Sequence, residues 1–150
     1  MKNVAVNKSV PHDYIVLETF EAGLALVGSE VKSVRAGRIS LKECYAEVRG
    51  GEVFLVKCHI SPYEAANIFN HDPLRERKLL LHRREIKRLA GKTQERGLTL
   101  VPTRVFIGDR GKIKVELALA RGKREHEKRE AIKKRDTDRE IRAALKNRSR

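Results

Sequence analysis

The sequence has few of the residues from which a disulfide scaffold, a membrane span or an aromatic surface is built. Its 150 residues include two cysteines, four prolines, three tyrosines, four phenylalanines and no tryptophan. No stretch approaches the roughly eighteen apolar residues that span a bilayer, and the first residues lack the apolar core and cleavage site of a signal peptide. We therefore expect a soluble, cytoplasmic protein that has no membrane partner and whose cysteines stay reduced.

The motifs of common catalytic and metal sites are also missing. There is no glycine-rich phosphate loop followed by Lys-Ser or Lys-Thr, no G-x-S-x-G elbow and no His-Glu-x-x-His. Cys58 and His59 are adjacent, but no Cys-x-x-Cys spacing accompanies them. The five histidines are scattered along the chain. We therefore expect no catalytic residues, no metal and no cofactor, and we place the chain among binding proteins rather than enzymes.

Positive charge is what the sequence has in excess. It contains 34 Lys and Arg against 20 Asp and Glu, a formal net charge of +14. Clustered Lys and Arg neutralise phosphates and release their counterions, so nucleic acid is the expected partner. An anionic membrane surface is the rival partner, but the basic C-terminal segment has no Trp, Phe or Tyr to insert into one.

Composition divides the chain into a body, residues 1–120, and a basic tail, residues 121–150. The tail holds 13 Lys and Arg against six Asp and Glu, which is half of the net charge in a fifth of the chain. A segment this polar buries too little surface to offset the entropy of ordering it. A sparse stripe of Ile132, Ile141 and Leu145 has near-helical spacing. We therefore predict a tail that is disordered alone and becomes a helix against a polyanion.

Alternating apolar residues and turn signals predict a mainly β body. Residues 1–13 read as irregular, and the stretch 61–77 reads as a loop. Pro102 places its own strand at an edge or a bulge. We expect hairpins over residues 14–27, 40–60 and 98–120, with turns at Glu21-Ala22-Gly23, Gly50-Gly51 and Asp109-Arg110-Gly111.

The same alternation predicts which side chains of these strands face the core. In the 40–60 hairpin both cysteines should point inward, together with their neighbours at every second position. In the last strand one face should be buried and the other, including Ala118, should point outward. The expected inward sets are Cys44, Ala46 and Val48, then Phe54, Val56, Cys58 and Ile60, then Ile113, Val115, Leu117 and Leu119.

Two helices complete the body. A short one should begin at a capping Ser29 and stop at Gly37, with Lys32 and Arg35 facing outward. An amphipathic one lies in the stretch 77–97. Its apolar residues are Ile86, Leu89 and Ala90, and they stand opposite Arg83, Arg84, Lys87 and Arg88.

About six strands in hairpins with two or three short helices predict a small antiparallel β-barrel, closed or partly open. Barrels of this size often belong to the oligonucleotide-binding (OB) class, whose exposed strands and loops hold RNA. A five-stranded sheet with helices on one face is the alternative architecture.

Five segments, in order and at matching spacing, carry a family resemblance over nearly the whole chain. They are HDY (12–14), EAGLALVGSEVKSVRAG (21–37), ISPY (60–63), HDPLRERKLLLHRREIKRLAGK (71–92) and GKREHEKRE (122–130). The chain resembles the SsrA-binding protein (SmpB) family. The resemblance implies an OB barrel and a monomeric adapter that binds the tRNA-like domain of transfer-messenger RNA (tmRNA, SsrA RNA). It also implies delivery of that RNA, with elongation factor Tu, to stalled 70S ribosomes for trans-translation.

The resemblance further implies which residues of the body contact tmRNA. The family's RNA-binding surface maps onto Glu21, Leu80 and Lys114. A carboxylate such as Glu21 accepts hydrogen bonds from base amino groups, which gives specificity that cations alone do not. From charge and position alone, supporting phosphate contacts are expected from Lys32, Arg35, Lys78, Arg83 and Arg84.

For the tail, the resemblance implies a helix that enters the decoding site of the small-subunit ribosomal RNA and the empty messenger channel. The family pattern Gly-Lys-Lys followed by Asp-Lys-Arg appears here as Gly122-Lys123-Arg124 and Glu127-Lys128-Arg129, with Glu in place of Asp. The imidazole of His126 would lie near decoding-site bases, where it could stack. The full expected set is His126, Glu127, Lys128, Arg129, Lys133, Lys134 and Arg135.

The basic body and tail leave two other functions open. The first is a ribosomal or ribosome-assembly protein bound permanently to ribosomal RNA. The second is a nuclease, which would need a cluster of acids, bases or metal ligands that the motifs do not supply.

Overall fold

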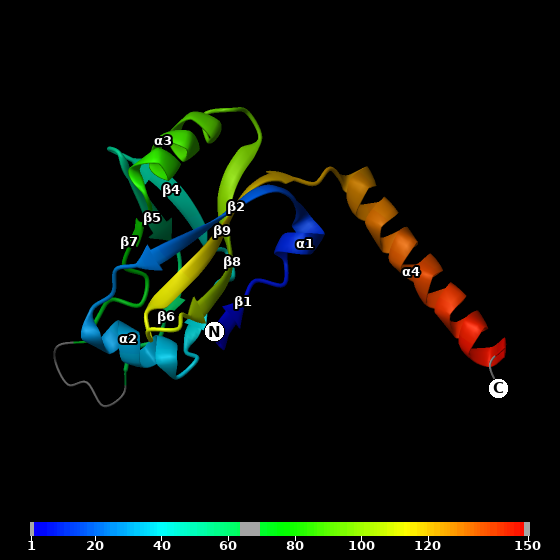
Figure 1. The fold of residues 1–150 in the computed structure, drawn as a ribbon, viewed down its shortest axis with the longest axis horizontal. Helices are drawn as coiled ribbons and strands as arrows, with labels where there is room; N and C mark the ends of the chain where they lie inside the picture. The colour runs from blue at the N-terminus through cyan, green and yellow to red at the C-terminus, as the bar shows by residue number, and fades with distance from the viewer. Residues whose placement is uncertain (1, 64–69, 149–150) are drawn as a thin grey trace.

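The computed structural model describes residues 2–63 and 70–148, in which a mainly β body carries a long C-terminal helix (Figure 1). In chain order the elements are β1 (Lys2–Val6), α1 (Val10–Asp13), β2 (Tyr14–Leu24), α2 (Gly28–Arg35), β3 (Ile39–Ser40), β4 (Tyr45–Arg49), β5 (Glu52–Val56), β6 (His59–Ile60), β7 (Arg77–Leu80), α3 (Arg83–Lys92), β8 (Leu98–Ile107), β9 (Ile113–Gly122) and α4 (Glu125–Arg148).

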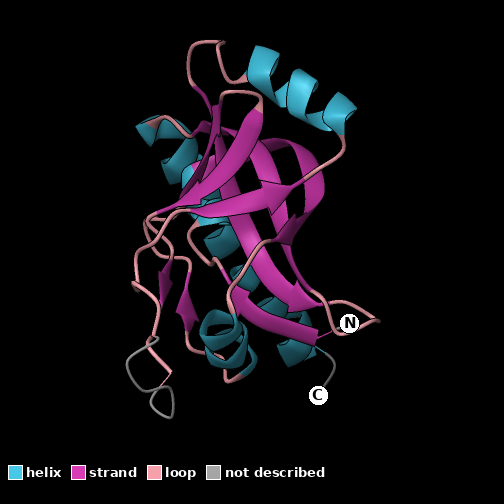
Figure 2. Ribbon diagram, turned by 90° about the vertical axis from the view of Figure 1, so that its left-hand side faces the viewer, coloured by secondary structure: helices cyan, strands magenta, loops and turns pink. Residues whose placement is uncertain are grey.

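The main sheet closes into an antiparallel barrel. Its strand order is β1-β8-β4-β5-β7-β2-β9, and an additional pairing of β8 with β9 joins the two sides into a ring. Figure 2 shows the strands curving around this ring, with α3 across one end and α2 at the other. The predicted mainly β, antiparallel barrel is confirmed, and the closed ring is consistent with the OB type.

Apolar side chains from the ring strands fill the barrel. Successive side chains of a strand point alternately to the inside and the outside of the ring, so every second residue of a strand can be buried in the core. Representative core residues from β2, β4, β5, β7, β8 and β9 are Phe20, Ala46, Val53, Leu79, Leu100 and Leu117.

Strand β9 follows the predicted alternation on its inner face only. Its four predicted core residues are 8% exposed or less. Ala118, expected to point outward, is fully buried together with Ala120, Val10 and Val101 in a second apolar cluster against Tyr14. The prediction for Ala118 is wrong because the segment around α1 covers this part of the outer surface.

The predicted hairpin over residues 14–27 is wrong, because β2 is one continuous strand of 11 residues. Glu21, Ala22 and Gly23 lie inside it and pair with Glu116, Val115 and Lys114 of β9. Gly23 also pairs with Leu80 of β7, and a Cβ at position 23 would lie 3.3 Å from the Leu80 Cβ. The glycine therefore allows close approach of a neighbouring strand rather than a turn.

Residues 2–13 are more ordered than predicted. Strand β1 pairs with β8 along its length, and the short helix α1 follows it with Pro11 in its first turn. The β8 register shifts between Pro102 and Arg104, so the predicted bulge at this proline is confirmed.

The stretch 77–97 contains a strand before its helix. Arg77–Leu80 forms β7 between β5 and β2, and only Arg83–Lys92 forms the amphipathic helix α3. Leu89 is its buried anchor, and Arg83 and Arg84 are exposed as predicted. The predicted loop over 61–77 thus ends before Arg77, and its residues 64–69 lie outside the described residues.

The 40–60 hairpin has the predicted turn but a different alternation in its second half. Val53 and Leu55 are fully buried, whereas Phe54 is half-buried on the other face, so its assignment to the core is wrong. Lys57 has a left-handed backbone, with φ of 59°, which resets the alternation after β5. Cys58 and Ile60 are therefore still buried as predicted.

Helix α2 begins differently from the prediction. Its N-cap is Val27 rather than Ser29, and the Glu30 carboxylate accepts a hydrogen bond from the Val27 backbone N–H. Gly37 follows the helix with φ of 77°, as expected for a helix stop. No helix in the described part of the chain is both long enough and apolar enough to span a bilayer.

Candidate nucleic-acid interface

The three body residues assigned to tmRNA come together around Gly23. In the register of the sheet this glycine lies between Leu80 of β7 and Lys114 of β9. The Lys114 ammonium donates a hydrogen bond to the Glu21 carboxylate, with an N–O distance of 2.7 Å. Three residues far apart in the sequence, one of them a carboxylate and one a cation, thus share one surface.

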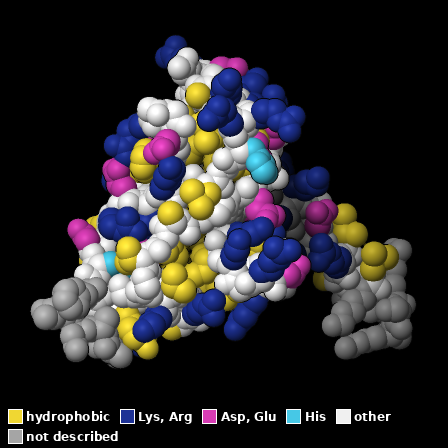
Figure 3. All heavy atoms as spheres, turned by 60° about the vertical axis from the view of Figure 1, so that its left-hand side comes forward, with side chains coloured by type: hydrophobic (Ala, Val, Ile, Leu, Met, Phe, Trp, Pro, Cys, Tyr) yellow, Lys and Arg dark blue, Asp and Glu magenta, His cyan; other side chains and the backbone are white. Residues whose placement is uncertain are grey.

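A groove of about 360 Å³ runs beside this cluster. Its lining is mostly apolar, and Lys112 and Lys114 border it on one side. Leu80 is 52% exposed, so its apolar side chain is open to a partner at this groove. Figure 3 shows Lys and Arg side chains (blue) around hydrophobic side chains (yellow) on the side of the molecule that carries β7 and α2.

Helix α2 brings two further cations to the end of the barrel. Lys32 and Arg35 are exposed as predicted. The Arg35 guanidinium donates a hydrogen bond to the Gly111 carbonyl oxygen at 3.0 Å, which ties the helix to the β8–β9 turn. The Lys32 ammonium lies 5.4 Å from the centre of the Tyr63 ring.

The position of α2 depends on a buried ion pair that the sequence did not reveal. Arg77 and Glu30 are both fully buried, and the Arg77 Nε donates to the Glu30 carboxylate at 2.5 Å. Burial alone would raise the pKa of Glu30. Hydrogen bonds from Arg75, the Val27 N–H and Arg77 outweigh it and hold the pKa below its ordinary value of 4.5. Glu30 is therefore a carboxylate anion that joins α2 to β7.

The remaining body cations lie along β7 and α3. The Lys78 ammonium donates to the Glu52 carboxylate at 2.7 Å, so one acid already neutralises it in part. Lys78 and Leu80 are both exposed on β7, two residues apart and therefore on the same face. Arg83 and Arg84 open α3 directly after this strand. The structure thus places Lys32, Arg35 and Lys78 with the Glu21 cluster around β7, α2 and the start of β9. Arg83 and Arg84 lie instead on α3, at the other end of the barrel.

The base of the tail is held to the segment around α1. The Lys123 ammonium donates to the Pro11 carbonyl oxygen at 2.9 Å, and the Lys128 ammonium lies 3.4 Å from the Asp13 carboxylate. The hydrogen bond from His12, together with Lys128, keeps the pKa of Asp13 below its ordinary value. Helix α4 then extends away from the barrel (Figure 1).

The tail candidates are all placed in α4, but not all of their surroundings are described. Lys133, Lys134 and Arg135 are exposed, and so are Ile141 and Leu145. The side chains of His126, Glu127 and Ile132 lie outside the described residues. Arg129 is exposed on the same helix.

The two cysteines are buried and unbridged. A hydrogen bond to Cys58, together with burial, raises the pKa of the Cys44 thiol. Cys44 is thus a protonated core residue. Among the residues that the structure describes, no group of three or more His, Cys, Asp or Glu side chains could hold a metal ion.

Comparisons with known proteins place the chain in one family. The family model described as SmpB protein matches residues 4–147. SsrA-binding protein of Symbiobacterium thermophilum is 58% identical over 145 residues, covering 97% of this chain and 92% of the relative. SsrA-binding protein of Enterococcus faecalis is 53% identical over 146 residues, covering 97% and 94%.

A solved structure agrees with the sequence relatives. The chain matches one described as "tmRNA-SmpB: a journey to the center of the bacterial ribosome" with a TM-score of 0.68 and 47% identity. The match covers 85% of this chain and 93% of the other.

Proposed function

Because this chain belongs to the SmpB family, we propose that it binds tmRNA and delivers it to stalled ribosomes for trans-translation. The role is that of an adapter, in which the chain binds two RNA partners and makes or breaks no covalent bond. Its place of action is the cytoplasm, where ribosomes translate, and it acts there as a monomer.

One observation carries the assignment of the tmRNA surface, namely the meeting of Glu21, Leu80 and Lys114 around Gly23. The carboxylate accepts hydrogen bonds from base amino or imino groups, and the ammonium binds phosphate. Leu80 supplies an exposed apolar contact beside them. Together these groups offer specificity, charge and shape at one place, whereas the general net charge offers attraction alone.

Further cations of the body support RNA binding. Lys32 and Arg35 on α2, Lys78 on β7, and Arg83 and Arg84 on α3 serve as phosphate contacts. Such contacts fix the orientation of the RNA and carry no sequence information. They make binding dependent on salt, because each neutralised phosphate releases counterions.

The tail acts on the second partner, the ribosome. The tail carries the helix α4, residues Glu125–Arg148, and on the ribosome this helix lies against the small-subunit ribosomal RNA. His126 stacks near decoding-site bases, and Glu127, Lys128 and Arg129 contact the decoding site. Lys133, Lys134 and Arg135 follow into the empty messenger channel. Elongation factor Tu joins this complex through tmRNA.

Reconstituted translation tests the proposal. Ribosomes stalled on a message without a stop codon are supplied with tmRNA and elongation factor Tu, with or without this chain, and tagging of the stalled peptide is measured. We expect tagging only when the chain is present. Equal tagging in both reactions would contradict the adapter role.

A further inference from the structure

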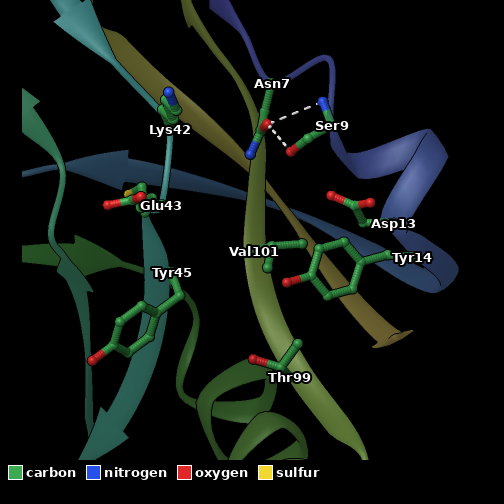
Figure 4. Close-up of a pocket in the computed structure, with 10 residues that line it drawn as sticks. Asn7, Ser9, Asp13, Tyr14, Lys42, Glu43, Tyr45, Thr99 and Val101 are labelled. Carbon is green, nitrogen blue, oxygen red and sulfur yellow. Dashed lines mark hydrogen bonds between the residues drawn. The ribbon is translucent and has the colours of Figure 1, made fainter. Parts of the chain in front are cut away.

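A second hollow lies at the opposite end of β2 from Glu21. A pocket of about 490 Å³ opens between the start of β2, strand β8 and the segment leading into β4 (Figure 4). Its lining includes Asp13, Tyr14, Lys42, Glu43, Tyr45 and Thr99. Tyr14 and Glu21 are seven residues apart in one strand, roughly 23 Å at 3.3 Å per residue.

Two of the chain's seven aromatic side chains line this pocket. The chain has three tyrosines, and Tyr14 and Tyr45 both line it. Figure 4 shows their rings on either side of Thr99, Tyr14 from β2 and Tyr45 from β4. The Lys57 ammonium lies 6.0 Å from the centre of the Tyr45 ring. Aromatic rings in a basic protein are the usual platforms for unstacked RNA bases.

Several polar groups at the pocket have no hydrogen-bond partner in the part of the chain that the structure describes. Among the described residues, the hydroxyls of Tyr14, Tyr45 and Thr99 and the charged ends of Lys42 and Glu43 make no hydrogen bond. Asp13 differs, because His12 and Lys128 already engage its carboxylate. Glu43 is therefore the carboxylate that can accept hydrogen bonds from a ligand.

The backbone at Glu43 is held in an uncommon conformation. Its φ is 64°, in the left-handed region that few residues other than glycine adopt. Leu41 and Cys44 on either side are 4% and 5% exposed, so the core anchors this turn. Such conformations persist only where the surroundings impose them, and they are concentrated at functional sites. Here the turn keeps Lys42 and Glu43 at the pocket.

We propose that this pocket binds one unstacked guanine base of single-stranded RNA. The rings of Tyr14 and Tyr45 lie against the base, and Lys42 neutralises its phosphate. Guanine is the best match for Glu43, since its N1–H and N2 amino group present adjacent donors to the two carboxylate oxygens. The inference rests on the proposed RNA-binding function and adds a second RNA contact to it, beside the base of the tail.

Nucleotide titrations of the full chain test the pocket itself. GMP, AMP, CMP and UMP are added in turn, and backbone amide signals are followed by NMR. We expect GMP to bind most tightly and to shift Tyr45 and Thr99 while leaving Gly23 unmoved. Failure of every nucleotide to shift Tyr45 and Thr99 would overturn the proposal.

Variants identify the groups responsible. Glu43→Gln should lower the ratio of GMP affinity to AMP, CMP and UMP affinity about tenfold, because the amide replaces one acceptor by a donor. Tyr45→Ala should weaken GMP binding about tenfold, whereas Tyr45→Phe keeps the ring and the affinity. Phe54→Ala, on the neighbouring strand, removes an aromatic ring away from the pocket and should leave GMP binding unchanged. An unaltered base preference in Glu43→Gln would overturn the assignment of guanine.

The source of the base is found by measuring the same variants on two RNAs. Glu43→Gln and Tyr45→Ala are tested for affinity to tmRNA and, separately, to ribosomes. Weaker binding of both variants to tmRNA or to ribosomes supports the proposal and identifies the RNA that supplies the base. Unchanged affinity for both overturns it. Failure of the unmodified chain to bind tmRNA contradicts the proposed function instead, and the GMP titration still tests the pocket.

Discussion

Lys114 and Glu21 neutralise each other across β2 and β9, with 2.7 Å between the ammonium nitrogen and a carboxylate oxygen. The pair is open to solvent, with side chains 37% and 56% exposed. An exposed pair contributes about 1 kcal/mol or less to stability. Substitutions of this pair should therefore leave the fold intact, so that their effect on RNA binding can be measured separately from stability.

Removing either partner of this pair should weaken tmRNA binding and leave the fold intact. Glu21→Ala loses an acceptor for base donors, and the expected loss of affinity is about tenfold, since such contacts contribute about 1–3 kcal/mol. Lys114→Ala should lose a similar amount, and the double variant should lose less than the sum, because the two side chains act together. Equilibrium binding to tmRNA measures all three.

The matched control for Glu21 is Glu18, which lies on the same strand and pairs with Arg88 at 2.9 Å. Glu18→Ala should retain tmRNA affinity. Equal losses in Glu18→Ala and Glu21→Ala would show that general charge, rather than the cluster, determines binding.

Leu80 and Leu79 are adjacent but should respond oppositely to truncation. Leu80→Ala removes a side chain that is 52% exposed, so we expect weaker tmRNA binding with little change in the free energy of unfolding. Leu79→Ala creates a cavity at a position 1% exposed and should cost about 2–5 kcal/mol of stability. Urea unfolding and RNA binding are measured on both variants. A large stability loss in Leu80→Ala would make it a core residue.

The buried pair of Glu30 and Arg77 predicts an acid-dependent loss of stability. The pKa of Glu30 is lowered in the folded state, so its contribution is present above its ordinary value of 4.5 and is lost as the pH falls through the folded pKa. Glu30→Gln leaves Arg77 buried without its counter-charge and should cost about 3–5 kcal/mol at neutral pH. The difference between the two proteins should then shrink below pH 4.5. A pH-independent difference in urea unfolding would contradict this role for the charge.

The tail should be separable from tmRNA binding. Deleting residues 127–150 removes the decoding-site candidates and leaves the barrel and the Glu21 cluster complete. We expect tmRNA affinity to stay within about threefold at physiological salt, because the deleted cations contact a different RNA. Peptide tagging on stalled ribosomes should be abolished. A large loss of tmRNA affinity would instead make the tail a general electrostatic anchor.

Sequence patterns predicted correctly those features of the fold that depend on neighbouring residues, such as the buried face of a strand and the end of a helix. The alternation in β9 identified its four core residues, and Gly37 marked the end of α2. The family resemblance selected Glu21, Leu80 and Lys114, which no periodicity would have selected. The structure brings the three to one surface, and their contact with tmRNA stays a prediction. The barrel class followed from counting strands, although two of the assumed strands were in fact one.

The errors arose where a partner distant in the sequence decides the structure. The residues around Gly23 predict a turn. The glycine is needed instead because Leu80 packs against it, and Leu80 is 57 residues away in the sequence, outside any local pattern. Only two residues separate strand β7 from α3, and the leucines of the strand continue the apolar pattern of the helix. The sequence pattern therefore does not show where the strand ends and the helix begins. Glu30 and Arg77 are 47 residues apart, and nothing in either segment indicates that their charges meet in the core.

The most direct test of the account is the affinity of the full chain for the tRNA-like domain of tmRNA. It is compared with the affinity for an unrelated structured RNA of equal length at physiological salt. The account predicts that the tRNA-like domain binds at least about a hundredfold more tightly, since specific contacts add to the electrostatic attraction that both RNAs share. Equal affinities would contradict it and leave only a basic protein that binds RNA without selection.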